Sequence, residues 1–118
     1  MKQKFRHIKL DYLEEICEGN DEFKKEMIHI FLEQVPAFIS NMNKYLEQGN
    51  NEELAKEAHT AKSSALIFMM DETGDTLKRI QTLAKKNDKE TLPSLVRKAE
   101  ISLNSAAEEL KAYLKESD

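Results

Sequence analysis

Three histidines are the candidate nucleophiles of this 118-residue chain: His7, His29 and His59. A neutral imidazole has a free ring nitrogen that can attack a phosphoryl donor, and histidine is substantially neutral near pH 7. The nucleophile of such a reaction must lie where another molecule can reach it. A histidine on the exposed face of its helix is therefore a reactive candidate, whereas one on the buried face is a structural residue.

His59 lies on the polar face of a predicted helix, about 125° from the centre of the apolar sector at about 100° per residue. That sector contains Leu54, Ala58, Ala61, Ala65, Phe68 and Met69. The neighbours of His59 one or two turns away are Ala55, Lys62, Ser63 and Leu66. Lys62 can place an ammonium beside phosphoryl oxygens, while the small Ala55 and Ser63 leave room for a second protein to align its reactive group. His59 is therefore the candidate phosphoacceptor.

An alternative chemistry is metal binding, because residues 26–29 (EMIH) read as the E-x-x-H motif of di-iron helical bundles. His29 lies about 160° from the centre of the apolar arc of its helix, so it should face water. The chain lacks the second E-x-x-H motif that a di-iron site requires. We therefore expect no metal site, and we expect His7 to be a surface residue.

Capping and breaking signals predict the first two helices. Asp11 and Glu14 have the spacing of a capping box before a short apolar-periodic stretch. After a Gly-Asn break, a long helix should span about residues 21–47, and Gly49 should end it. Pro36 lies inside this helix and should kink it, because proline removes one backbone hydrogen bond.

Three further helices are predicted over residues 50–70, over about residues 71–86, and from residue 88 or 91 onward. Asn50 and Glu53 repeat the capping-box spacing at the first of these starts. The later start of the last helix places Pro93 in the first turn, where proline is tolerated. The apolar stripe of this helix contains Leu92, Val96, Ala99, Leu103, Ala106, Leu110 and Tyr113.

The composition indicates the fold class. The chain has three Gly and two Pro, with 40% hydrophobic and 34% charged residues, so it has too few turn residues for a sandwich or a barrel. We expect an all-α fold, an antiparallel up-down-up-down four-helix bundle with a short extra N-terminal helix covering one end. Residues 1–118 should form a single domain with a bundle core over about residues 10–115, and the apolar stripes should serve as core without any cofactor.

Charge and hydropathy exclude several classes of function. A net charge of −4 disfavours nucleic acid and anionic membranes as partners. The longest apolar run, residues 65–70, is far shorter than the roughly 20 residues that span a bilayer. Cys17 is the only cysteine, and the first six residues lack the apolar core of a signal peptide. We therefore expect a cytoplasmic, monomeric protein that acts on a protein partner or a small anion.

The segment EAHTAKSS (residues 57–64) resembles the A-H-x-x-K-[GS]-S signature of histidine-containing phosphotransfer (HPt) domains. The segment FLEQVPAFI (residues 31–39) is similar to the same family, including its proline. The resemblance implies that His59 is phosphorylated, that Lys62 contacts the phosphoryl group, and that a four-helix bundle exposes His59 on its third helix. Two positions depart from the family pattern, since Ser63 replaces the usual glycine and residues 68–69 (FM) replace the usual Leu-Gly turn.

The resemblance further implies a phosphorelay phosphocarrier, which accepts a phosphoryl group from a receiver-domain aspartyl phosphate and passes it to another receiver domain. Its partners would be response-regulator receiver domains and a hybrid sensor histidine kinase, docking on Ala55, Ser63 and Leu66 around His59. The chain has no Gly-rich nucleotide loop, so we expect a carrier and not an ATP-using enzyme. It would need no cofactor, because the acidic pocket of the partner would hold Mg²⁺.

A non-phosphorylated helical adaptor is the alternative function. The apolar arc of the long second helix spans about 200°, which is wider than a bundle core needs. Part of this arc could form an exposed patch that binds signalling partners. An adaptor of this kind would tolerate His59→Gln, whereas a phosphocarrier would not.

Overall fold

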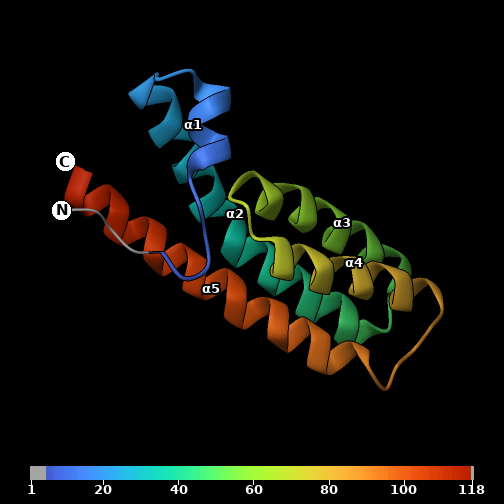
Figure 1. The fold of residues 1–118 in the computed structure, drawn as a ribbon. Helices are drawn as coiled ribbons and strands as arrows, with labels where there is room; N and C mark the ends of the chain where they lie inside the picture. The colour runs from blue at the N-terminus through green and yellow to red at the C-terminus, as the bar shows by residue number, and fades with distance from the viewer. Residues whose placement is uncertain (1–4, 118) are drawn as a thin grey trace.

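The computed structural model describes residues 5–117, and its elements are five helices joined by short connections (Figure 1). The helices are α1 (Asp11–Cys17), α2 (Asp21–Gln48), α3 (Asn51–Ile67), α4 (Asp71–Lys85) and α5 (Leu92–Ser117). The described residues include no strand, so the predicted all-α class is confirmed. None of the described helices is both long and apolar enough to cross a membrane.

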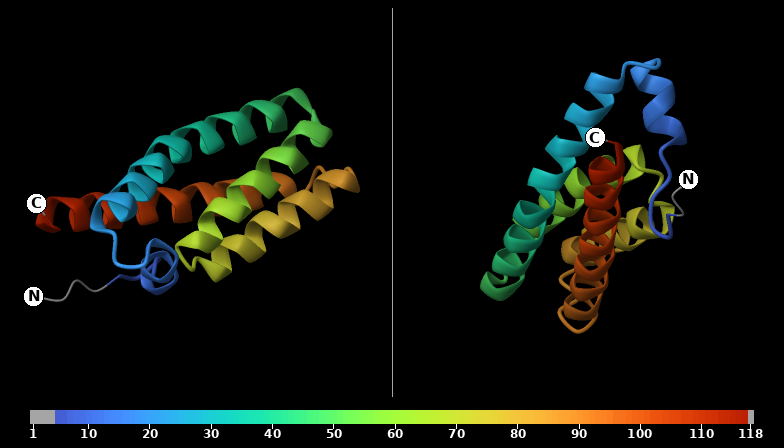
Figure 2. Two further views of the ribbon diagram at one scale, coloured as in Figure 1. Left: turned by 90° about the horizontal axis from the view of Figure 1, so that it is seen from above. Right: turned by 90° about the vertical axis from the view of Figure 1, so that its left-hand side faces the viewer.

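The four long helices enclose one apolar core. α3 packs against α2 and α4, α5 also packs against α2 and α4, and α1 packs against α2 (Figures 1 and 2). Fully buried side chains come from every helix and from the α3–α4 turn, and they include Leu13, Phe31, Leu54, Phe68, Ile80 and Leu103. The rings of Phe31 and Phe68 lie 4.5 Å apart between centroids within this core. The predicted apolar stripes are therefore packed as core, except for Met69, which is half-buried and lines a surface hollow.

Helix α3 begins with one half of the predicted capping box, because the N–H of Asn50 donates to the carbonyl of Tyr45 at 2.9 Å and not to the side chain of Glu53. Helix α1 begins without a side-chain cap. The side chain of Asn50 accepts a hydrogen bond from the backbone N–H of Glu53 at 3.3 Å. The predicted capping box at Asp11 is wrong, because Leu10 is the cap residue and no side chain caps α1. Leu10 is only 7% exposed, and its carbonyl accepts a hydrogen bond from the N–H of Glu14 at 2.8 Å. The packing of Leu10 therefore decides where α1 begins.

Helix α3 ends at Ile67, before the predicted end at Met70. The backbone N–H of Lys9 donates to the carbonyl of Phe68 at 2.9 Å, and Met69 adopts a left-handed φ of 57°. This turn carries Phe68 into the core and directs the chain into α4. Local backbone bonds also close the turn, since the N–H of Met70 donates to the carbonyl of Ala65 at 3.2 Å. The apolar periodicity did not indicate this end, because no glycine marks the left-handed position.

Helices α2 and α5 accommodate their prolines in different ways. Helix α2 continues through Pro36 without interruption. Helix α5 begins at Leu92 and has Pro93 in its first turn, close to the later of the two predicted starts. Just before it, the N–H of Thr91 donates to the carboxylate of Asp88 at 3.2 Å.

Helix α4 approaches α3 closely at Gly74. A Cβ atom at this position would lie 2.9 Å from Leu66 Cδ2 and 3.9 Å from Lys62 Cγ. The first of these distances is shorter than real Cβ atoms allow, so the lack of a side chain permits this approach. α4 consequently lies beside the face of α3 that carries Lys62 and Leu66.

Candidate functional site

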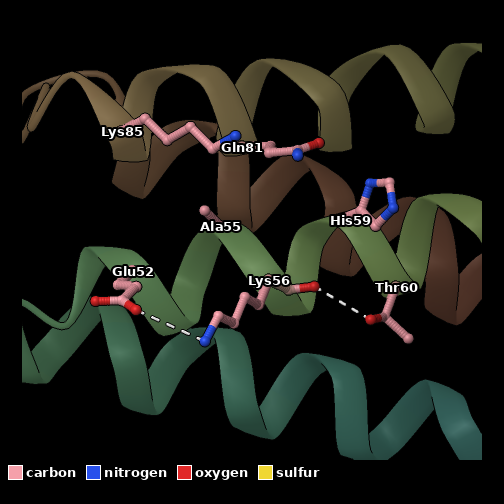
Figure 3. Close-up of a pocket in the computed structure, with 7 residues that line it drawn as sticks. All are labelled: Glu52, Ala55, Lys56, His59, Thr60, Gln81 and Lys85. Carbon is pink, nitrogen blue, oxygen red and sulfur yellow. Dashed lines mark hydrogen bonds and ion pairs between the residues drawn. The ribbon is translucent and has the colours of Figure 1, made fainter.

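His59 is exposed on α3 and lines a hollow between α3 and α4 (Figure 3). The other residues of this hollow are Glu52, Ala55, Lys56 and Thr60 of α3 and Gln81 and Lys85 of α4. The hollow has a volume of about 560 Å³ and is open to solvent. A reactive group on a second protein can therefore reach the imidazole.

Helix α3 presents His59 to solvent because its opposite face is buried. The residues of that face include three alanines with no exposed surface: Ala58, Ala61 and Ala65. The hydroxyl of Ser63 donates to the backbone carbonyl of His59 at 3.2 Å, so it is satisfied within the helix. Among the described residues, no group forms a hydrogen bond or an ion pair with the imidazole of His59. The ring is held by its helix and is free to react.

Lys62 lies one turn beyond His59, with its stem against α4. The side chain is half-buried, and its Cγ lies 3.9 Å from the position of a Cβ atom at Gly74. Within the described part of the chain, no carboxylate pairs with the Lys62 ammonium. Packing of the stem therefore keeps an uncompensated cation one turn from the imidazole.

The structure separates the three small or apolar residues that were predicted to flank His59 at the surface. Ala55 is only 4% exposed, so its prediction as a surface neighbour was wrong. The pairing of α4 with α3 buries it and leaves it at the wall of the hollow. Ser63 and Leu66 are exposed, and they line a second hollow together with Tyr12 of α1. The predicted docking residues thus lie in two hollows, on either side of His59 along α3.

Sequence reasoning missed the residues that other helices bring to this face, namely Gln81 and Lys85 of α4 and Tyr12 of α1. Gln81 and Lys85 are four residues apart and share one face of α4, but only the packing shows that this face meets His59. Gly74 lies two turns before Gln81 on the same face. This glycine is the one signal in the sequence that could have indicated a close approach of α4 to its neighbour.

The other two histidines do not line the hollow beside His59. His29 is exposed on α2, as its helix position predicted. The described residues contain no group of three or more His, Cys, Asp or Glu that could hold a metal ion. His7 is exposed, and its ring lies 3.8 Å from the carboxylate of Glu109. That carboxylate also accepts a hydrogen bond from the backbone N–H of His7 at 3.1 Å, which attaches the N-terminal segment to α5.

Residues 26–117 match the model of one protein family, the Hpt domain. Because the match covers most of the chain and includes His59, the protein belongs to the Hpt domain family, which confirms the resemblance of residues 57–64. Over 69 residues the chain is 29% identical to the phosphorelay intermediate protein YPD1 of Candida albicans. The aligned residues are 58% of this chain and 38% of that relative, so the similarity spans less than half of its length. No solved structure matches the chain.

Proposed function

We propose that this protein is a phosphorelay phosphocarrier whose phosphoacceptor is His59. The observation that carries the proposal is the exposed imidazole at an open hollow, without a partner among the described residues, inside the part of the chain that matches the Hpt family. We infer that His59 receives a phosphoryl group from an aspartyl phosphate of one receiver domain and delivers it to an aspartate of another. The relative YPD1 is named a phosphorelay intermediate protein, which supports the proposal that this chain is a carrier.

The chemistry requires one nucleophile that also becomes a leaving group. In the first step, a ring nitrogen of neutral His59 bonds to phosphorus while the P–O bond to the donor aspartate breaks. The electron pair of that bond leaves with the aspartate as a carboxylate, and the imidazolium loses its other ring proton to water. In the second step the ring regains a proton, the carboxylate of the accepting aspartate attacks phosphorus, and the P–N electron pair returns to the imidazole.

The neighbours of His59 suit this transfer. The ammonium of Lys62 can stabilise negative charge on the moving phosphoryl oxygens. The small side chains of Ala55 and Ser63 leave the ring accessible for an in-line approach. Leu66 is 42% exposed and offers an apolar contact to a docked receiver domain.

The partners that this chemistry requires are receiver domains and a hybrid sensor histidine kinase that supplies the phosphoryl group. The receiver provides the aspartate and the acidic pocket that holds Mg²⁺, so the carrier uses no cofactor or ATP site of its own. We propose that the carrier acts as a monomer and that residues 1–118 form one domain. Short connections between helices that pack on each other support the antiparallel up-down-up-down order.

The test is phosphorylation of the purified protein, first by phosphoramidate and then by a phosphorylated receiver domain. We expect one added phosphoryl group per chain, labile in acid and stable in base, at His59. Adding a second, unphosphorylated receiver domain should remove the label. A label on His7 or His29, or no label from either donor, would contradict the proposal.

A further inference from the structure

Basic side chains are concentrated in the second half of α4 and the first part of α5. Residues 78–98 contain seven Lys or Arg and two Asp or Glu, which gives this segment a formal net charge of +5. Because the whole chain has a net charge of −4, the other residues together carry −9. The carboxylate of Asp88, one of the two in the segment, accepts hydrogen bonds from the N–H and the hydroxyl of Thr91. This end of the bundle is therefore a basic region of an acidic protein.

Four exposed cations of this segment form a surface that we call the basic face. They are Arg79 and Lys86 at α4 and Arg97 and Lys98 at α5. Arg79 and Lys86 are seven residues apart, which is about two helical turns, so they lie on one side of α4. Glu72, seven residues before Arg79, lies on the same side, and its carboxylate is 3.9 Å from Lys98 Nζ. The side of α4 that carries Arg79 and Lys86 therefore faces Lys98 of α5.

The packing of α4 against α5 places Arg79 near Lys98. Thr73 of α4 and Ser102 of α5 line the same hollow, so they lie at about the same level of the two helices. From this level toward the connection at residues 86–91 (Figure 1), Arg79 is six residues along α4 and Lys98 is four residues along α5. These separations are about 9 Å and about 6 Å along the helix axes, so the two cations are neighbours across the α4–α5 contact.

Most cations of the basic face lack a compensating charge. Within residues 5–117, no carboxylate forms an ion pair with Arg79, Lys86 or Arg97. The pair of Lys98 with Glu72 joins two side chains that are 55% and 89% exposed, so solvent screens it. Like charges that are held close together repel one another, and an acidic ligand removes this repulsion. The basic face is therefore suited to bind carboxylates from outside the chain.

An exposed isoleucine lies beside these cations. Ile101 is 60% exposed, and it follows Arg97 and Lys98 by one helical turn on α5. A side chain of this size gains free energy when a partner buries it. Cations around an apolar contact suit an acidic protein segment that also carries an apolar side chain. A nucleic acid fits less well, because the residues outside 78–98 carry −9 charges and would repel its phosphates.

We propose that the basic face and Ile101 form a docking site for an acidic, partly apolar segment of another protein. This inference goes beyond the proposed function, since none of these five residues lines the hollow beside His59 or the second hollow along α3. The segment would bring carboxylates to Arg79 and Lys98 and an apolar side chain to Ile101. A bound segment of this kind would leave the residues around His59 uncovered.

The test uses a fluorescent synthetic peptide in which Asp and Glu flank a single Leu. Its Kd is measured by anisotropy for the wild type, for Ile101→Ser, and for a double variant with Arg79→Gln and Lys98→Gln. The matched control is a double variant with Lys111→Gln and Lys115→Gln. It changes the net charge by the same amount at two exposed lysines near the other end of α5.

We expect the double variant at Arg79 and Lys98 to bind the peptide about tenfold more weakly. Each pair of unit charges about 4 Å apart in water contributes about fivefold, and salt screens part of this. The control should bind like the wild type. Rising ionic strength should weaken the wild type more than the double variant at Arg79 and Lys98.

The apolar contact has its own expected result. Ile101→Ser should weaken binding by about fivefold, and so should replacing the Leu of the peptide by Ser. The two changes together should weaken binding no more than either alone, because they remove one shared contact. If the double variant at Arg79 and Lys98 folds poorly, Lys86→Gln and Arg97→Gln test the same face.

Four results would overturn this docking site. They are wild-type binding in the double variant at Arg79 and Lys98, equal weakening in the control, tighter binding of single-stranded DNA of matched charge, and sedimentation showing that the face joins two copies of this chain. The proposed function is tested separately, because the double variant at Arg79 and Lys98 should still be phosphorylated by phosphoramidate at the wild-type rate.

Discussion

The N-terminal end of the bundle and the surface of α3 and α4 around His59 use charged side chains for different purposes. At the N-terminal end, Lys24 is 12% exposed and pairs with Glu14 at 3.2 Å and with Asp21 at 3.4 Å. The carboxylate of Glu109 accepts a hydrogen bond from the backbone N–H of Arg6 at 3.0 Å. These interactions join α1, α2, α5 and the segment before α1, so charge at this end holds elements together.

The surface around His59 shows the opposite arrangement. Three of its polar side chains, His59, Lys62 and Lys85, have no hydrogen-bond or ion-pair partner within residues 5–117. Exposed and unpaired groups contribute little to the free energy of unfolding, but they are available to a ligand. We therefore expect substitutions at the N-terminal end to lower the free energy of unfolding and substitutions around His59 to lower the rate of phosphoryl transfer.

The largest expected effect is that of His59→Gln. The variant should lose all phosphoryl transfer, because it lacks the nucleophile, while its free energy of unfolding stays within about 0.5 kcal/mol of the wild type. Single-turnover transfer from a phosphorylated receiver domain and urea unfolding measure the two quantities. His29→Gln, the matched control on another exposed face, should change neither. A large loss of stability in His59→Gln would mean that the ring stabilises the fold, which would contradict the separation of folding from transfer at this surface.

Ser63→Trp should reduce transfer between proteins by about tenfold or more, because the indole fills the space through which a receiver domain must bring its aspartate. Phosphorylation by phosphoramidate should fall much less, since a small donor needs less room. Ser63→Gly is the control: it keeps the approach open and should cost the helix about 0.5 kcal/mol. Undiminished receiver-dependent transfer in Ser63→Trp would show that partners dock on another face.

Lys62→Ala should slow transfer to and from receiver domains by about five- to tenfold, because it removes one cation near the phosphoryl oxygens. Lys62→Met removes the charge and keeps the apolar stem that packs near Gly74. Equal rates in the two variants would assign the effect to the charge. A normal rate in Lys62→Met would assign the slowing in Lys62→Ala to the packing of the stem. Lys62 would then be a structural residue, like Lys24.

Lys24→Met should have the reverse profile, with normal transfer and a free energy of unfolding lowered by about 1 kcal/mol, because the variant loses the ammonium that joins Glu14, Asp21 and Tyr113. Chemical denaturation and single-turnover transfer are the two measurements. Slowed transfer in a folded Lys24→Met variant would show that the N-terminal end also takes part in the relay.

The contribution of Lys24 should also depend on pH. A hydrogen bond with Tyr113 raises the pKa of the Lys24 ammonium above its ordinary value of 10.5, and bonds to Glu14 and Asp21 act in the same direction. Because the pKa is raised in the folded state, this stabilisation is complete below pH 10.5 and is lost as the pH rises toward the folded-state pKa. The difference in unfolding free energy between the wild type and Lys24→Met should therefore be constant near neutral pH and shrink in strong alkali.

The exposure of His59 could be predicted because it depends on the period of a single helix. The burial of Ala55 and the positions of Gln81 and Lys85 beside His59 could not be predicted, because they depend on how α4 packs against α3. A helical wheel contains no information about the register between two helices. The sequence therefore located the exposed His59 and the neighbouring Lys62, and only the packing located the second wall of the hollow.

The helix limits show the same division between local and distant causes. The cap at Asn50 depends on residues three positions apart, and this half of the predicted capping box was confirmed. The start of α1 involves the burial of Leu10, and the end of α3 combines a left-handed Met69 with a hydrogen bond from Lys9 to Phe68. Local spacing predicted a cap at Asp11 and a helix through Met70, and both predictions were wrong.

Gly74 has a consequence for the directed evolution of this protein. A glycine inside a helix costs about 1 kcal/mol relative to alanine, so a screen for heat resistance alone would favour Gly74→Ala. The new methyl group would meet Leu66 Cδ2 at 2.9 Å, the end of a flexible and exposed side chain that can turn aside. Leu66 would then leave its place beside the second hollow. The heat-resistant descendants of such a screen would fold better and transmit signals less well.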